Sequence, residues 1–335
     1  MASSLDTSRK EKHLIVLSIP DDAYYRKNLQ DIECFVRDMS EKTQGLDDVL
    51  LIYSKSMQKR YKGSFGSLFG LNTTSLVVEE SLDLWMRDFS PVLPKHEVKF
   101  TYKPKYIKSK DAKFVESEFM KVLRKMDIQL NRNDIILDGG NVVDNNCNKA
   151  IISERVFLDN KGKTPTVLHN ELENLLATKV AFIPDPEDTT GHADGIVAFV
   201  EDNVLLIGDY GDEEYYKSVE YAVKSVFPEV ETFRLPCSSD SAVDKKWEGF
   251  TTAGGSYPNM LVTNNAVYVP QYNQPSYDTQ AIEVIRSHTS KKIVPVDVSK
   301  LSHMGGSVRC MSWQIESFQP IAQALYKNSS GKNNQ

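Results

Sequence analysis

The sequence lacks any long apolar run and has little excess charge. Its first apolar stretch, LIVLSI, is only of strand length, and the polar start MASSLDTSRKEKH does not fit a signal peptide, so we expect no membrane span. The net charge of −6, from 46 acidic and 40 basic residues, argues against a nucleic-acid partner and suits a cationic ligand.

Cysteine is also scarce, and no two of the four are close in sequence: they are Cys34, Cys147, Cys237 and Cys310. No pair has the spacing of a metal site, so we expect no bound metal. Without a secretory signal, free thiols in a reducing, cytoplasmic compartment are predicted. A Pro/Gly-rich linker is missing too. Residues 1–335 are therefore interpreted as one domain, with disordered ends at 1–12 and 327–335.

A repeated local pattern is present instead. Single strands such as KVAFIP follow amphipathic segments, and pairs of β-branched runs precede them. The clearest pair, NMLVTNNAVYVPQY, turns at Asn264-Asn265, which we attribute to the tolerance of asparagine for positive φ. The order hairpin, helix, strand predicts an α/β protein of repeated units. Helical spacing of apolar residues occurs within residues 23–39, 114–126, 166–179, 213–227 and 279–288.

A short polar motif opens each predicted hairpin, and a fifth lies near the C-terminus. The motifs are WMRDFSP (85–91), LDGGN (137–141), TTGHADG (189–195), SYPNM (256–260) and GGSVRC (305–310). Radial closure of the repeats would bring all five motifs to one end of the molecule.

Each motif alone also has a plain structural explanation. Asp88 and Arg87 could form a surface ion pair, and LDGGN could be an ordinary turn. His192 and Asp194 are two residues apart, so on a strand both side chains would point to one face. The pair could be a histidine stabilised by a neighbouring carboxylate. It could also be part of a metal site, but no second His-rich motif completes one. A lone Cys310 is more often buried and inert. The recurrence of five such motifs at equivalent places favours a shared site.

In this order the motifs W-x-R-D, D-G-G-N, G-H-x-D, S-Y-x-N and G-G-x-x-x-C resemble the agmatine deiminase and bacterial-type peptidylarginine deiminase family, from about Trp85 to Gln314. The first 80 residues resemble that family only in their strand–helix–strand layout. The resemblance implies a pentein fold, which is an α/β-propeller of five pseudo-symmetric ββαβ repeats around a central axis. It also implies an enzyme that needs no cofactor.

The resemblance implies catalytic roles for five residues: the nucleophile Cys310, the acid/base His192, the guanidinium-binding carboxylates Asp88 and Asp194, and Asp138, which stands where the family often has Glu and orients the histidine. Substrate contacts are expected from Trp85, Asn259, Asn141 and Arg309. These residue types suit the chemistry, because paired carboxylates hold a planar cation over the sulfur and a thiolate attacks it. The histidine then protonates ammonia and activates water.

Two positions depart from the agmatine pattern, since Met304 replaces a glycine and Arg309 replaces a histidine. Arg309 either lines the substrate tail, where it would bind a carboxylate, or points outward. Alternation with Cys310 along a strand favours the outward direction.

We therefore expect a guanidine iminohydrolase that converts agmatine to N-carbamoylputrescine and ammonia through a cysteine thiouronium, with a small cationic guanidine as its partner. A deiminase of peptidyl or free arginine is the alternative, and a non-catalytic guanidino-binding protein is the second. An amide hydrolase is disfavoured, because two carboxylates would repel its oxyanion. A homo-oligomer is one of the assemblies left open.

Overall fold

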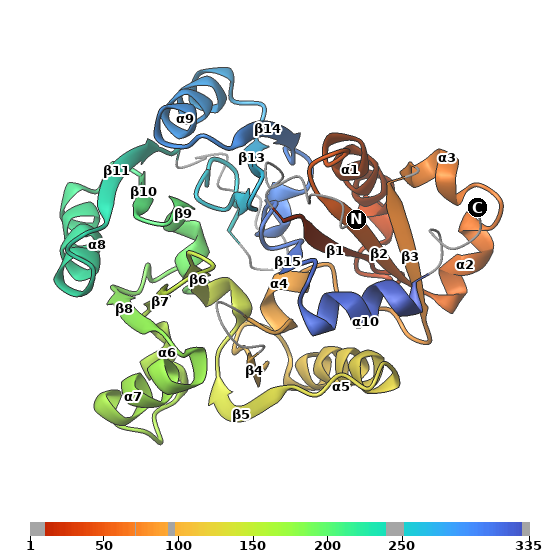
Figure 1. The fold of residues 1–335 in the computed structure, drawn as a ribbon, viewed down its shortest axis with the longest axis horizontal. Coiled ribbons are helices and arrows are strands. Elements are labelled where there is room, and N and C mark those ends of the chain that lie inside the picture. The colour runs from red at the N-terminus through yellow and green to blue at the C-terminus, as the bar shows by residue number, and fades with distance from the viewer. Residues whose placement is uncertain (1–10, 71, 93–97, 239–250, 330–335) are drawn as a thin grey trace, which may run out of the picture.

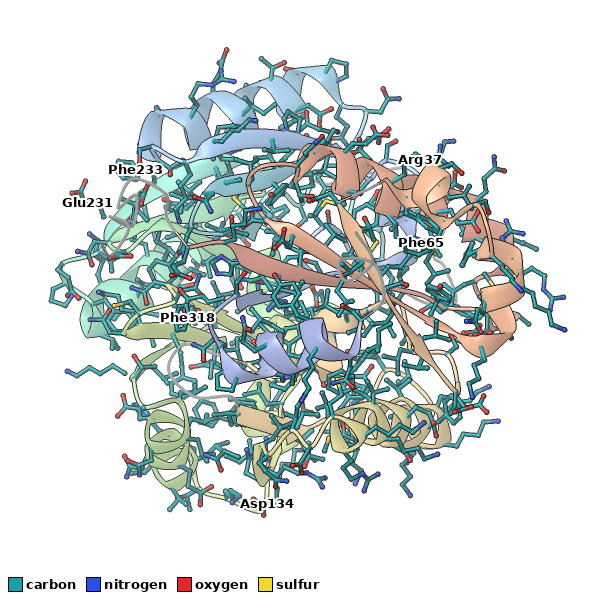
Figure 2. All side chains as sticks on the ribbon, turned by 45° about the vertical axis from the view of Figure 1, so that its right-hand side comes forward. Arg37, Phe65, Asp134, Glu231, Phe233 and Phe318 are labelled. Atoms are coloured by element: carbon teal, nitrogen blue, oxygen red, sulfur yellow. The ribbon has the colours of Figure 1, made fainter. Side chains whose placement is uncertain are left out.

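The computed structural model describes residues 11–70, 72–92, 98–238 and 251–329. Within these residues the strands form five separate sheets, which follow one another in chain order around the centre of the molecule (Figure 1). The long helices lie on the outside of the sheets in both views (Figures 1 and 2). The predicted mixed α/β class is confirmed.

Three sheets share the predicted construction, in which an antiparallel hairpin is followed by a helix and then by a strand parallel to the second hairpin strand. The first comprises β6 (Val142–Asp144), β7 (Lys149–Ser153), α6 (Arg155–Asp159), α7 (Pro165–Leu176) and β8 (Lys179–Ile183). The second comprises β9 (Val197–Glu201), β10 (Val204–Asp209), α8 (Glu213–Val226) and β11 (Glu231–Pro236). The third comprises β12 (Leu261–Val262), β13 (Ala266–Gln271), α9 (Pro275–His288) and β14 (Lys292–Asp297).

A fourth sheet keeps only part of this construction. Its strands β4 (Val98–Thr101) and β5 (Asn131–Ile136) pair in parallel, and α5 (Ser109–Lys125) connects them. Within the described residues its hairpin is reduced to one antiparallel bridge between Val92 and Val98.

The remaining sheet joins the two ends of the described chain. Strand β15 (Trp313–Glu316) pairs antiparallel with β1 (His13–Ile19), which pairs in parallel with β2 (Asp48–Ser54), and β3 (Thr73–Val78) lies at the far edge. An antiparallel pair of the C-terminal and N-terminal strands thus takes the place of the local hairpin of the other sheets. The helices of this part are α1 (Leu29–Lys42), α2 (Lys55–Tyr61), α3 (Phe65–Phe69) and α10 (Pro320–Asn328).

The five predicted helical segments form α1, α5, α7, α8 and α9. Helix α8 shows why, because Tyr216, Val219 and Val223 recur at helical spacing and are buried on one face. Its amino end is capped by Asp212, whose carboxylate accepts hydrogen bonds from the backbone N–H groups of Glu214 and Tyr215.

The hairpin turn at Asn264-Asn265 is present, but our reason for it was wrong. Neither asparagine is among the described non-glycine residues with positive φ. The side chain of Thr263 holds the turn instead, because its Oγ1 accepts hydrogen bonds from Asn265 N (3.3 Å) and Ala266 N (3.1 Å).

Most of the predicted disordered ends, residues 1–10 and 330–335, lie outside the described residues. The expectation of disorder fails at Lys327 and Asn328, because they form the last turn of α10, where Ile321, Ala322 and Leu325 are buried. None of the helices in the described part of the chain is both long and apolar enough to cross a membrane.

Candidate active site

The five motifs occupy equivalent positions, each just before the strand that opens its sheet or, for the last motif, before β15. Asp88 lies in the short helix α4 (Met86–Phe89), which precedes the Val92 bridge. The second and third motifs form 3₁₀ turns at Gly139–Asn141 and Ala193–Gly195. Asn259 precedes β12 by two residues.

Cys310 and the pair His192/Asp194 do not lie on strands, so the alternation arguments for them were wrong. Cys310 belongs to a turn closed by a hydrogen bond from Met311 N to Ser307 O (3.1 Å), and β15 begins only at Trp313. His192 instead directly precedes the 3₁₀ turn Ala193–Gly195 and Asp194 lies within it, yet both side chains reach one cleft.

Backbone and side-chain hydrogen bonds join the motifs to one another. These bonds run from Arg87 N to Cys310 O (3.1 Å), from Ala193 N to Asn141 Oδ1 (3.2 Å), from Asn259 Nδ2 to Asp194 O (3.4 Å) and from Arg309 N to Asn259 O (3.2 Å). Glycine also allows a close approach, because a Cβ at Gly140 would lie 2.4 Å from His192 Nδ1 and 2.8 Å from Asp88 Oδ1. The five motifs therefore meet as the repeated pattern predicts.

At this meeting point lies a cleft of about 1290 Å³. The motif residues that line it are Trp85, Asp88, Thr189, Thr190, His192, Asp194, Gly195, Ser256, Asn259, Gly305, Gly306 and Cys310. Trp85 packs closely against the glycine pair, since a Cβ at Gly306 would lie 2.3 Å from its ring.

The Cys310 thiol is held by one asparagine. Asn259 Nδ2 lies 3.1 Å from Cys310 Sγ, and Asn259 Oδ1 accepts a hydrogen bond from Cys310 N (3.2 Å). Asp194 Oδ2 lies 3.9 Å from the sulfur. Burial, together with the charges of Asp194 and Asp88, raises the pKa of the Cys310 thiol well above its usual range. This environment therefore favours the thiol form.

His192 lies among carboxylates. Its Nε2 is 3.2 Å from Asp138 Oδ2, and its Nδ1 is 3.8 Å from Asp88 Oδ1. Burial acts to lower the pKa of His192, but the charges of Asp88, Asp138 and Asp194 outweigh it and raise the pKa to about 10. The imidazole therefore carries a proton at neutral pH.

Asp88 is buried and is not half of a surface ion pair. Its Oδ1 has no hydrogen-bond partner, and the neighbouring Arg87 side chain is directed to Gln314. Burial raises the pKa of Asp88 to about 7; the His192 cation opposes this shift, and Asp138 and Asp194 add to it. The His192 cation, 3.8 Å from Asp88 Oδ1, therefore only partly offsets the cost of burying this carboxylate.

Arg309 faces away from the cleft, as the outward alternative predicted. Its Nη1 donates to Asp194 Oδ2 (2.9 Å) and its Nη2 to Val142 O (2.8 Å), and its side chain is buried. It is not among the described residues that line the cleft. The expectation that Arg309 contacts a substrate was wrong. Its guanidinium group binds the buried carboxylate of Asp194 and does not line the cleft.

Asn141 and Asp138 also lie behind that wall. Asn141 Oδ1 accepts hydrogen bonds from Ser153 N (2.8 Å) and Ala193 N (3.2 Å), so the side chain is used in joining two motifs and not in a substrate contact. Asp138 touches His192 from the far side, which fits the orienting role implied for it.

Sequence reasoning missed Tyr106, which lies in the segment between β4 and α5 and lines the cleft. Its hydroxyl donates to Asp138 Oδ2 (2.7 Å), the oxygen that also lies 3.2 Å from His192 Nε2. No motif surrounds it, so only the fold brings it to the site.

Further carboxylates in the cleft wall were also missed because they are scattered along the chain: Asp21, Asp22, Glu80, Asp83, Asp111, Asp185, Glu187, Asp188 and Asp212. Among the described lining residues there is one lysine, Lys108, and no arginine. The cleft is therefore strongly attractive to cations.

Within the described residues, no group of three or more His, Cys, Asp or Glu side chains is arranged to hold a metal ion. All four cysteines are free, as predicted, and Cys34 and Cys147 are exposed.

Known proteins resemble this chain in sequence and fold. The family model for Porphyromonas-type peptidyl-arginine deiminase matches residues 6–315. Agmatine deiminase of Medicago truncatula is 24% identical over 214 residues, which span 54% of this chain and 57% of that protein. The match thus spans little more than half the length of this curated relative.

Solved structures with the same fold include C. jejuni agmatine deiminase, with a TM-score of 0.72, 19% identity, and coverage of 91% of this chain and 94% of that chain. DDAH from Pseudomonas aeruginosa, complexed with citrulline, has a TM-score of 0.54 at 14% identity and covers 91% of this chain and 99% of that chain. These similarities show a pentein-type α/β fold.

Proposed function

The chain belongs to the Porphyromonas-type peptidyl-arginine deiminase family, and we propose that it is a guanidine iminohydrolase that acts on agmatine. The products are N-carbamoylputrescine and ammonia. One observation carries the proposal: the cleft brings Cys310, His192, Asp88 and Asp194 together, with the sulfur 3.9 Å from one of the carboxylates.

The two carboxylates bind the planar guanidinium ion. Asp88 offers a buried oxygen without a hydrogen-bond partner, and Asp194 lines the same cleft beside the sulfur. Charge-assisted hydrogen bonds from the guanidinium N–H groups to both carboxylates fix its central carbon near Sγ. Trp85 flanks the aliphatic stem.

Substrate binding also generates the nucleophile. The guanidinium brings a positive charge next to a thiol whose pKa burial and two carboxylates have raised. That charge offsets the carboxylates and favours the thiolate. The thiol proton leaves to solvent, so the thiol is poorly reactive in the free enzyme and the thiolate forms only against the bound guanidinium.

The reaction then proceeds in two balanced halves. Thiolate Sγ attacks the guanidinium carbon, His192 donates a proton to one nitrogen, the C–N bond breaks and ammonia leaves. The resulting S-alkylthiouronium is attacked by water; one water proton passes to His192 and the other to solvent as the C=O bond forms, and breakage of the C–S bond releases the neutral ureido product and the thiolate. Asp138 and Tyr106 orient the imidazole for both proton transfers.

The wall of the cleft favours a substrate with a cationic tail. Agmatine ends in an ammonium group, which suits the surplus of carboxylates, whereas free arginine ends in a carboxylate that would need a cation. Arg309, the candidate for that cation, lies behind Asp194. Lys108 is the single lysine among the described lining residues.

Peptidyl arginine is the second candidate, and the size of the cleft favours it. A volume of about 1290 Å³ exceeds the roughly 300–1,000 Å³ of most small-molecule sites, and Tyr24 and Phe114 of its lining are exposed. A basic peptide segment around the arginine would also suit the acidic wall.

A colorimetric ureido assay tests the function on agmatine, free arginine, an arginyl peptide and methylated arginine in parallel. Product from agmatine at a kcat/KM above the others supports the proposal. Turnover of peptidyl or free arginine without turnover of agmatine overturns the substrate, and no product from any guanidine overturns the reaction class.

We also infer that the five sheets are the blades of an α/β-propeller within one domain. The motif before each blade and the pairing of β1 with β15 support this, since that pairing closes the ring.

A further inference from the structure

One carboxylate of the cleft is held from behind by a buried cation. Arg309 Nη1 lies 2.9 Å from Asp194 Oδ2, and the side chains of the two residues are 8% and 2% exposed. The second Arg309 Nη donates to Val142 O (2.8 Å), which fixes the plane of the guanidinium group. Backbone N–H of Arg309 is bound to Asn259 O (3.2 Å), so its main chain is fixed as well.

The same Asp194 oxygen lies 3.9 Å from Cys310 Sγ. Oδ2 is therefore engaged by Arg309 on one side and lies near the sulfur on the other, which leaves Oδ1 for a ligand in the cleft. An isolated buried carboxylate is costly and tends to take up a proton, whereas one paired with an arginine stays charged.

We propose that Arg309 is a positioning residue, whose ion pair with Asp194 Oδ2 orients the carboxylate so that Oδ1 binds a guanidinium in the cleft. The inference rests on the proposed function, because it concerns how that site holds its substrate. It assigns Arg309 a role in binding the reacting group and not the substrate tail.

Other charges near Asp194 do not replace Arg309. Arg87 is buried nearby, but its guanidinium bonds to Gln314. Within the described part of the chain, the charge of Asp194 also acts on Cys310, Asp88 and His192; the imidazolium is the cation of these three, and it is bound to Asp138.

Propylguanidine, which has no charged tail, is a suitable probe of this role. The measurement is the protecting concentration, which is the propylguanidine concentration that halves the rate of Cys310 alkylation by iodoacetamide. The rate is read at the Cys310 peptide by mass spectrometry, between pH 6 and pH 9. The variants are Arg309→Met, Arg309→Lys and Asp194→Asn. Arg60→Met is the control, since it removes a cation from another buried carboxylate, Glu33 (2.7 Å).

In Arg309→Met we expect the protecting concentration to rise at least about tenfold, because Asp194 loses the partner that stabilises and orients its carboxylate. Arg309→Lys keeps the positive charge, so its protecting concentration should stay within about threefold of the wild-type value at every pH. In Asp194→Asn, propylguanidine should not protect Cys310 at any pH tested. In Arg60→Met, the protecting concentration should equal that of the wild type.

A protecting concentration in Arg309→Met equal to that of the wild type overturns the positioning role and leaves the proposed function intact. A pH-independent loss shared equally by Arg309→Met and Arg309→Lys, with lowered melting temperatures, shows a purely structural residue and overturns it too. If propylguanidine fails to protect the wild-type enzyme, the guanidine site itself is wrong and both proposals fall.

Discussion

Asn259 Nδ2 lies 3.1 Å from Cys310 Sγ, and the oxygen of the same amide accepts the backbone N–H of Cys310. One side chain from the motif before β12 therefore fixes both the position of the sulfur and the turn that carries it. An amide can donate to a thiolate without adding a charge of its own. This relationship places the thiol at the floor of an acidic cleft.

Replacement of Cys310 by serine should abolish turnover and leave the fold intact. A hydroxyl is far harder to ionise than a thiol, so the attacking species is lost. The measurement is ureido product from agmatine together with the melting temperature. Cys34→Ser, at an exposed cysteine, is the matched control and should retain activity. Near-normal turnover in the Cys310 variant would remove this thiol from the mechanism.

Replacement of His192 by glutamine should let a covalent adduct persist. The thiouronium needs a base to activate water, and glutamine cannot accept that proton. Peptide mass spectrometry after incubation with agmatine should show added mass on the Cys310 peptide. His169→Gln on α7, where the side chain is 41% exposed, should behave as the wild type. An adduct on Cys237 or Cys147 instead would identify a different nucleophile.

Replacement of Asp88 by asparagine should damage catalysis severely, because a buried partner of the substrate cation is removed. The expected loss is about 2–5 kcal/mol of transition-state binding, or about 30- to 5000-fold in kcat/KM. Asp134→Asn is the control, since the Asp134 side chain is 83% exposed (Figure 2) and its surface ion pair with Lys163 contributes about 1 kcal/mol or less. A small, salt-sensitive effect at Asp88 would contradict the assignment.

The free enzyme should show a poorly reactive Cys310 at neutral pH. Its raised pKa keeps the thiol protonated, so the alkylation rate with neutral iodoacetamide should keep rising above pH 9, beyond the range of an ordinary cysteine near 8.5. Exposed Cys34 provides the internal comparison within the same digest. A midpoint for Cys310 at or below the ordinary value would show that the carboxylates do not govern the thiol.

Local patterns in the sequence predicted the elements well. The helix α8 and the hairpin of β12 and β13 follow from apolar spacing over a few residues, which the chain satisfies wherever it folds. The fourth sheet was less clear, because its hairpin is reduced to one bridge between Val92 and Val98. The N-terminal sheet could not be foreseen from local patterns, since the partner of β1 is the distant β15.

Side-chain directions at the site were harder to predict. Strand alternation predicted the outward direction of Arg309 for the wrong reason, because residues 307–311 form a turn and not a strand. The side chain is directed by its ion pair with Asp194, which lies 115 residues away in the sequence. Asn141 was expected to contact a substrate but instead bonds to the backbone of Ser153 and Ala193.

By itself the sequence determined the motifs, their order, the α/β units and the residue types that a guanidine chemistry requires, because these depend on composition and on spacing over one supersecondary unit. Only the tertiary structure decided that Tyr106 supports Asp138, that Arg309 lies behind Asp194, and that scattered carboxylates such as Asp22 and Asp83 line one cleft. The reason is physical: the charge and the pKa of each group depend on neighbours that chain folding, and not sequence proximity, brings within a few ångströms.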